Sequence, residues 1–214
     1  KPLLSAKLSG GKVISESKIP EIGVTEFKLS NGVKVVLKPT DFKNDEISFS
    51  AFSAGGSSLY SDADFQSALY ATAIIRNGGL GEFNSVQLPK LLSGKKVSVS
   101  PYIMERYEGI SGSTSPKDIE TALQLTYLYF TQPRKDAETF KGLIAQQKGG
   151  LANRGNDPNS VFADSLSAVL GNYNIRRTGP SVEKLNQINL DRAFDIYKER
   201  FADASDFTFV FVGN

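Results

Sequence analysis

The chemistry open to this chain is limited first by the residue types that it lacks. Its 214 residues include no histidine and no cysteine, so the two commonest protein ligands of a catalytic zinc are missing. Serine and threonine are plentiful, but a hydroxyl nucleophile needs a base within hydrogen-bond reach, and no motif points to one. The sequence therefore predicts no catalytic residue and no metal ligand of its own.

Two motifs that resemble functional ones have simpler structural explanations. Asp62 and Asp64 could form a carboxylate pair for acid–base work or a cation site. They lie at a predicted helix N-terminus, however, where the helix dipole already favours carboxylates. The glycine-rich residues 78–81 follow a predicted helix rather than a strand, and no Lys-Ser/Thr pair comes next, so they are not a phosphate-binding loop.

Two pairs of basic residues are the remaining candidates for binding. Arg176 and Arg177 lie in a polar loop and could contact an acidic peptide or an opposing domain, although such pairs are usually solvated. Lys95 and Lys96 precede a predicted strand, where lysines discourage edge pairing. Solvation is therefore the interpretation that we adopt for both pairs.

Composition excludes several classes of protein. With 40% hydrophobic and 22% charged residues and a net charge of +2, the chain is typical of a globular protein and does not favour nucleic acid or a membrane as its main partner. No apolar run approaches the roughly 20 residues that span a bilayer. Because the chain starts without Met and stops after a strand-like run, we expect it to be a segment of a longer protein. Its localisation stays open, cytoplasmic or periplasmic if the parent is of a bacterial type.

The N-terminal half predicts mostly strands. Residues 1–21 show no clear period and are expected to be a linker or extended lead-in. Residues 24–29 and 33–37 alternate apolar and polar side chains around Asn31-Gly32, which predicts a hairpin. Further strands are expected at residues 46–52, 97–100 and 107–112, with helices from residue 62 to Gly78 and over residues 85–92.

The C-terminal half predicts mostly helices. One is expected from a Ser115 cap to Pro133, and one from residue 134 to about residue 153. Another is expected over residues 158–170, with apolar residues spaced for burial, then a last helix near residues 190–201 and a strand at 207–212. This order predicts an α+β fold over residues 22–214, one domain with helices packed on one face of a mixed, mainly antiparallel sheet.

Several phrases add a resemblance to this pattern. They are residues 25–36 (TEFKLSNGVKVV), 54–58 (AGGSS), 112–115 (GSTS) and 209–214 (FVFVGN). In this order and spacing they resemble the insulinase/pitrilysin family of inverted-motif zinc peptidases (inverzincins), which includes the mitochondrial processing peptidases. The resemblance covers residues 22–214, nearly all of the chain.

The resemblance also locates where the zinc chemistry of the family is missing. Catalytic domains of that family carry an H-x-x-E-H helix whose two His bind zinc and whose Glu is the general base, and a downstream Glu completes the site. The corresponding helix here reads LYATA over residues 69–73, or one residue later, with Leu69, Thr72 and Ala73 at the degenerate motif positions. Residues 141–154 contain no Asp or Glu, so the third ligand is missing as well.

The resemblance therefore implies a non-catalytic domain of a zinc metalloendopeptidase. Residues 201–206 (FADASD) resemble the first domain of the C-terminal half in bacterial members. In that case, sister domains or a catalytic partner subunit hold the zinc and the general base. This domain would then form part of a chamber around unfolded peptide substrates.

Two alternatives remain open at this point. Relatives of the fold also serve as purely structural subunits in respiratory complexes, with no protease activity. The chain could also be an independent module that binds an extended peptide along an exposed strand edge.

Overall fold

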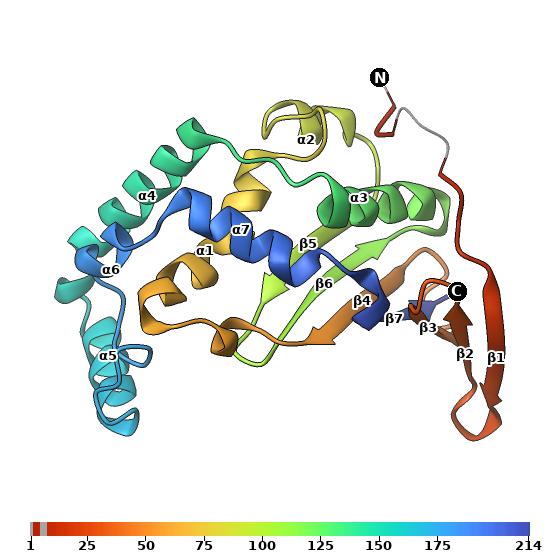
Figure 1. Ribbon diagram of the computed structural model, residues 1–214, viewed down its shortest axis with the longest axis horizontal. Helices are drawn as coiled ribbons and strands as arrows, with labels where there is room; N and C mark the ends of the chain where they lie inside the picture. The colour runs from red at the N-terminus through yellow and green to blue at the C-terminus, as the bar shows by residue number, and fades with distance from the viewer. Residues whose placement is uncertain (1, 5–7) are drawn as a thin grey trace.

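The computed structural model describes residues 2–4 and 8–214, and in them seven strands form one sheet (Figure 1). The strand order is β1-β2-β3-β7-β4-β6-β5; β3 and β7 are parallel, and all the other neighbours are antiparallel. The predicted mixed, mainly antiparallel α+β fold is confirmed. The strands are β1 Val13–Ile19, β2 Val24–Leu29, β3 Lys34–Pro39, β4 Ile47–Ala54, β5 Val97–Ile103, β6 Tyr107–Thr114 and β7 Thr208–Gly213.

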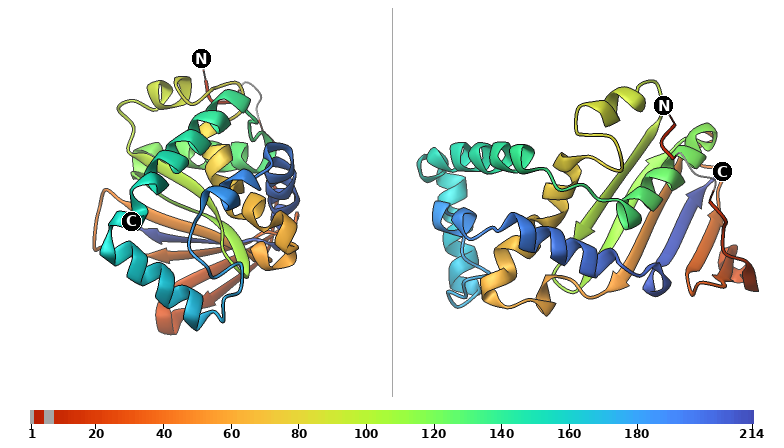
Figure 2. Two further views of the ribbon diagram at one scale, coloured as in Figure 1. Left: turned by 90° about the vertical axis from the view of Figure 1, so that its left-hand side faces the viewer. Right: turned by 45° about the horizontal axis from the view of Figure 1, so that its top comes forward.

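Helices α1 and α3 pack against one face of the sheet, and α7 packs against both of these helices (Figures 1 and 2). In β4, Phe49 and Ala51 point to the covered face and are buried, whereas Phe52 on the other face is exposed. The helices are α1 Asp62–Gly78, α2 Gln87–Leu91, α3 Ile119–Thr131, α4 Ala137–Ala152, α5 Pro158–Leu170, α6 Val182–Asn186 and α7 Leu190–Phe201.

The predicted hairpin is present. β2 and β3 pair antiparallel, and Gly32 takes φ +91° in the turn, where its N–H donates to the Leu29 carbonyl at 2.9 Å. Only glycine adopts this backbone conformation without strain, so Asn31-Gly32 sets the register of the hairpin.

The region expected to be a linker or lead-in contains a strand. β1 pairs antiparallel with β2 and forms one edge of the sheet. Six of its seven residues are exposed. Because neither side of the strand is buried, its sequence does not alternate between apolar and polar residues, and periodicity could not identify it. The division of the chain at residue 21 stays a prediction.

The core lies between α1, α7 and the sheet. Tyr197 and Phe201 of α7 stack with ring centroids 4.5 Å apart, and both are fully buried. The Tyr197 hydroxyl donates to the carbonyl of Tyr129 in α3 at 3.0 Å, so its one polar group is satisfied. Burial raises the pKa of Tyr197 well above its usual value, which keeps this donor protonated.

The side of α1 that faces α7 is lined with small residues, which let α7 pack closely. Leu69 and Arg76 of α1 are exposed. The side chains that α1 and α3 bury include Ala68, Ala71, Ile74, Ile75, Ala122, Leu125, Leu128 and Tyr129. Both helices carry apolar residues on more than one side, so periodicity alone could not select the buried one.

Helix α5 contradicts the prediction of burial more completely. Its apolar residues are spaced for one buried side, yet Phe162 is 68% and Leu170 is 78% exposed. None of the residues of α5, all of them described, is buried. The spacing therefore correctly predicted that these residues share one side of the helix, but the domain does not bury that side.

The loop from β4 to α1 depends on Gly56. Gly56 takes φ +78°, and a Cβ there would lie 2.5 Å from the Met104 carbonyl oxygen in the β5–β6 turn. Its neighbours bind the same turn, since Ser57 N–H donates to the Met104 carbonyl and Ser58 N–H to the Glu105 carbonyl, both at 2.8 Å. These contacts hold the start of α1 against the turn.

We predict that Gly56→Ala lowers the free energy of unfolding by about 3 kcal/mol or more, because it adds a backbone clash to an unfavourable φ. Gly94→Ala is the control, since Gly94 has φ +80° but open space around it. In this control the free energy of unfolding should fall by about 1 kcal/mol, because only the unfavourable φ contributes. Urea unfolding followed by circular dichroism measures both, and equal losses would contradict the proposed clash.

Candidate functional site

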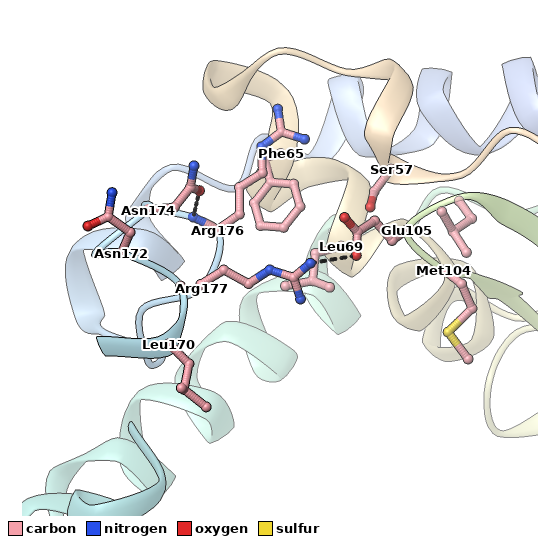
Figure 3. Close-up of a pocket in the computed structure, with 12 residues that line it drawn as sticks. Ser57, Phe65, Leu69, Met104, Glu105, Leu170, Asn172, Asn174, Arg176 and Arg177 are labelled. Carbon is pink, nitrogen blue, oxygen red and sulfur yellow. Dashed lines mark hydrogen bonds and ion pairs between the residues drawn. The ribbon is translucent and has the colours of Figure 1, made fainter. Parts of the chain in front are cut away.

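A hollow lies where α1, the β5–β6 turn and the loop after α5 meet (Figure 3). It has a volume of about 550 Å³. Its apolar residues are Phe65, Leu69, Ile103, Met104 and Leu170, and its polar residues include Ser57, Glu105, Asn172, Asn174, Arg176 and Arg177. An apolar lining with a few polar groups is typical of a binding site.

Arg176 is a structural residue at the edge of this hollow. Its Nε donates to Asp62 Oδ1 and its Nη2 donates to the Tyr60 carbonyl, each at 2.6 Å. Its guanidinium also lies over the Phe65 ring, 4.7 Å from the centroid. The expectation that this arginine is simply solvated is therefore wrong, because it anchors the loop to the start of α1.

Arg177 lies next to Arg176 but has much weaker contacts. Its Nη2 donates to Glu105 Oε2 at 2.8 Å across the hollow (Figure 3), and both side chains are more than half exposed. An exposed ion pair of this kind contributes little to stability and exchanges readily with water. Arg177 is thus the cation of the hollow that a ligand could reach.

The carboxylates at the start of α1 are both engaged in ion pairs. Asp62 binds Arg176, and Asp64 Oδ2 accepts from Arg192 Nε at 3.0 Å. Each therefore has an arginine partner in addition to its favourable place at the helix N-terminus. Nothing in this arrangement matches a carboxylate pair poised for acid–base work.

The three degenerate zinc-motif positions on α1 do not come together as a site. Leu69 is half exposed and lines the hollow, Thr72 is buried, and Ala73 is half-buried. Two hydrocarbon side chains and one hydroxyl do not fit a zinc ion, which takes imidazole, thiolate or carboxylate ligands. In the described residues, no three Asp or Glu side chains gather where they could hold a metal. The equivalence of these positions to the family motif stays a prediction.

A buried ion pair under the β4–α1 loop was not found from the sequence. Glu108 of β6 is only 2% exposed and accepts a hydrogen bond from Gly56 N–H at 2.6 Å. Arg200 Nη1 lies 3.8 Å from its other oxygen. Burial raises the pKa of Glu108, against the opposing effects of the Gly56 hydrogen bond and Arg200. In the sequence, this pair is marked only by Gly55. A Cβ at that position would lie 2.5 Å from the Glu108 carboxylate, so the site requires a glycine there.

A second polar network joins α7 to the start of α1. The Tyr60 hydroxyl donates to Glu199 Oε2 at 2.9 Å, and Arg192 Nη1 donates to Glu199 Oε1 at 2.8 Å. Burial and the Glu199 hydrogen bond raise the pKa of Tyr60 to about 12, so it remains a donor. This network positions one wall of the hollow and is not itself catalytic.

Sequence comparisons identify two curated relatives, although no family profile matches the chain. It is 32% identical over 214 residues to the zinc protease PQQL-like of Arabidopsis thaliana, covering 99% of this chain and 20% of that protein. It is 24% identical over 201 residues to the probable zinc protease PqqL of Haemophilus influenzae, covering 89% of this chain and 20% of that protein. The chain thus spans about one-fifth of the length of these relatives.

Solved structures match the fold over most or all of the chain. The periplasmic protease PqqL from Escherichia coli gives a TM-score of 0.81 at 21% identity, covering 100% of this chain and 23% of that one. The peptidase M16 inactive domain from Pseudomonas fluorescens gives a TM-score of 0.70 at 17% identity, covering 89% of this chain and 46% of that one. The chain has the fold of an insulinase-type (M16) peptidase domain.

The first half of Escherichia coli PqqL, solved separately, also shares the fold. It gives a TM-score of 0.67 at 14% identity, covering 89% of this chain and 42% of that one.

We predict that the two adjacent arginines of the insulinase-type domain differ in their contribution to stability. Arg176→Ala should lower the free energy of unfolding by about 2 kcal/mol, because it loses two charged hydrogen bonds and a ring contact. Arg177→Ala, the matched control, should lose less than about 0.5 kcal/mol, as exposed ion pairs usually do. Urea unfolding measures both, and equal losses would contradict the structural role of Arg176.

Proposed function

We propose that this domain is a non-catalytic part of a zinc metalloendopeptidase and forms a section of the wall that encloses its peptide substrate. The observation that carries the proposal is the combination of an insulinase-type fold with an α1 that contains no His and no Glu. Zinc and the general base then come from another domain or a partner subunit.

The comparisons support a parent of this kind. Both curated relatives are named as zinc proteases, and both are about five times as long as this chain. A ferredoxin protease, FusC, solved in complex with Arabidopsis ferredoxin, shares the fold with a TM-score of 0.79 at 17% identity. By analogy, we infer a protein or peptide substrate here, and a place as the first domain of the C-terminal half.

Within this proposal, the hollow is the surface best suited to touch a substrate. Phe65 and Leu69 provide apolar area, and Arg177 provides a cation held only by an exposed ion pair. A peptide carboxylate could replace Glu105 as the partner of Arg177 without leaving a buried charge unpaired. The contribution of such a site is to bind and orient the substrate, since it holds no base or nucleophile.

A purely structural subunit with no protease activity is the second candidate. It is favoured by the complete absence of His and Cys in the chain, since no trace of the zinc site is retained. The two candidates predict different behaviour of the parent protein in the presence of zinc.

The test is hydrolysis of a quenched fluorescent peptide by the full-length parent, first with zinc and then with a chelator. We expect cleavage that falls at least about tenfold on chelation, because a catalytic zinc supplies the activated water. A parent that does not cleave the peptide when loaded with zinc would overturn the proposal and favour the structural subunit.

Metal content gives a second measurement on the same protein. Because Leu69 and Thr72 are not ligands in this proposal, Leu69→Ala and Thr72→Ala should leave the zinc content of the full-length parent unchanged by elemental analysis. A loss of zinc in Thr72→Ala, with the fold intact by circular dichroism and with zinc retained in Leu69→Ala, would contradict the proposal.

A further inference from the structure

Helix α5 has its polar side toward its own domain. Asp164 Oδ2 and Oδ1 accept two hydrogen bonds from Arg154 at 2.8 and 2.7 Å, and the Ser167 hydroxyl donates to the Arg177 carbonyl at 2.7 Å. Asp164 is also packed against Gly179, where a Cβ would lie 2.5 Å from its carboxyl carbon. Polar contacts therefore fix which way α5 is turned.

The opposite side of α5 is apolar and open to solvent. Positions 161, 162, 165, 166, 169 and 170 lie on one side of a helix, and none of them is charged. The exposed apolar residues here and in the loop that follows are Val161, Phe162, Leu166, Val169, Leu170, Tyr173 and Ile175. We call this set the α5 apolar face. Exposed apolar side chains gathered along one side of a helix are typical of an interaction surface.

The neighbouring helix α4 is covered on one side only, where Phe140, Leu143 and Ile144 are partly buried against the core. Its residues are all described, and none of them is buried. Gly142, Gly149 and Gly150 have no atom within 4 Å of where a Cβ would lie, so the domain itself does not require glycine there. Glycine weakens a helix relative to alanine. Three of them in one helix are consistent with close approach by another structure. Figure 2 shows α4 and α5 beyond the end of the strands.

We propose that the α5 apolar face and α4 form the docking surface for a sister domain of the same polypeptide. The inference rests on the proposed function, because it takes the chain to be one unit of a multidomain peptidase. Permanent interfaces are more hydrophobic than transient ones, and their centres are depleted of charge. An uncharged apolar face along all of α5 fits a permanent partner better than a passing peptide.

The size of the matched structures identifies the partner. The chain covers 42% of the first half of Escherichia coli PqqL and 46% of the inactive domain structure from Pseudomonas fluorescens. A second unit of similar size thus accompanies the matched one in each of these chains. The occupant of the docking surface is such a unit, presenting an apolar, uncharged surface of its own.

The first experiment is photo-crosslinking in the full-length parent. Benzoylphenylalanine replaces Phe162 in one variant and Phe42, which is 89% exposed in the β3–β4 connection, in the control. A mixture of isotopically light and heavy protein is irradiated and analysed by mass spectrometry. We expect intramolecular crosslinks from position 162 to residues outside this chain, with at least fivefold higher yield than from position 42.

Other crosslinking results would overturn the docking surface. They are crosslinks confined to this chain, crosslinks between light and heavy copies, crosslinks to an added peptide, and no crosslinks above the yield at position 42. The readout does not depend on hydrolysis. If the parent does not cleave peptide with zinc but gives the expected crosslinks, the docking surface is supported and the proposed peptidase function is overturned.

A charge substitution provides an independent measurement. Leu166→Asp should expose α5 in the full-length parent and raise the rate of limited proteolysis within residues 153–176 at least tenfold. Phe42→Asp is the matched control and should leave that rate unchanged. An unchanged rate in Leu166→Asp would contradict the proposal, because an exposed surface with no partner tolerates a charge.

Discussion

The insertion of β7 between β3 and β4 is the constraint on which the rest of the fold depends. β7 pairs parallel with β3 on one side and antiparallel with β4 on the other, so it joins the β1-β2-β3 part of the sheet to the β4-β6-β5 part. It comes from the far end of the chain, directly after α7. The two parts of the sheet are therefore joined only when this last strand pairs between them, a contact between segments far apart in the sequence.

The position of the hollow follows from the same packing. α7 carries Arg192 and Glu199, which bind Asp64 and Tyr60 at the start of α1, and Arg200 lies beside the buried Glu108 of β6. These polar contacts fix the β4–α1 loop, and with it one wall of the hollow. Charged residues that a reader of the sequence would examine for catalysis therefore serve mainly to position backbone. Removing one partner leaves the other buried or half-buried, which explains why such networks matter for local order.

Much of the fold could be predicted because local rules dominate it. Asn31-Gly32 specifies the hairpin, Ser115 accepts from Asp118 N–H as a helix cap should, and Gly78 ends α1. β1 was missed because both of its sides are exposed. Glu108 was missed because its partners, Gly56 and Arg200, are 52 and 92 residues away in the sequence, and no local pattern marks a pairing of that kind.

By itself the sequence determined the order of most of the elements and the absence of imidazole and thiolate ligands, because both depend only on residue types and local spacing. It also determined that α5 has one apolar side. Only the tertiary structure decided that this side faces solvent and that Arg176 is anchored while Arg177 is not. Periodicity fixes which residues share a side of a helix, but contacts between distant segments decide what covers that side.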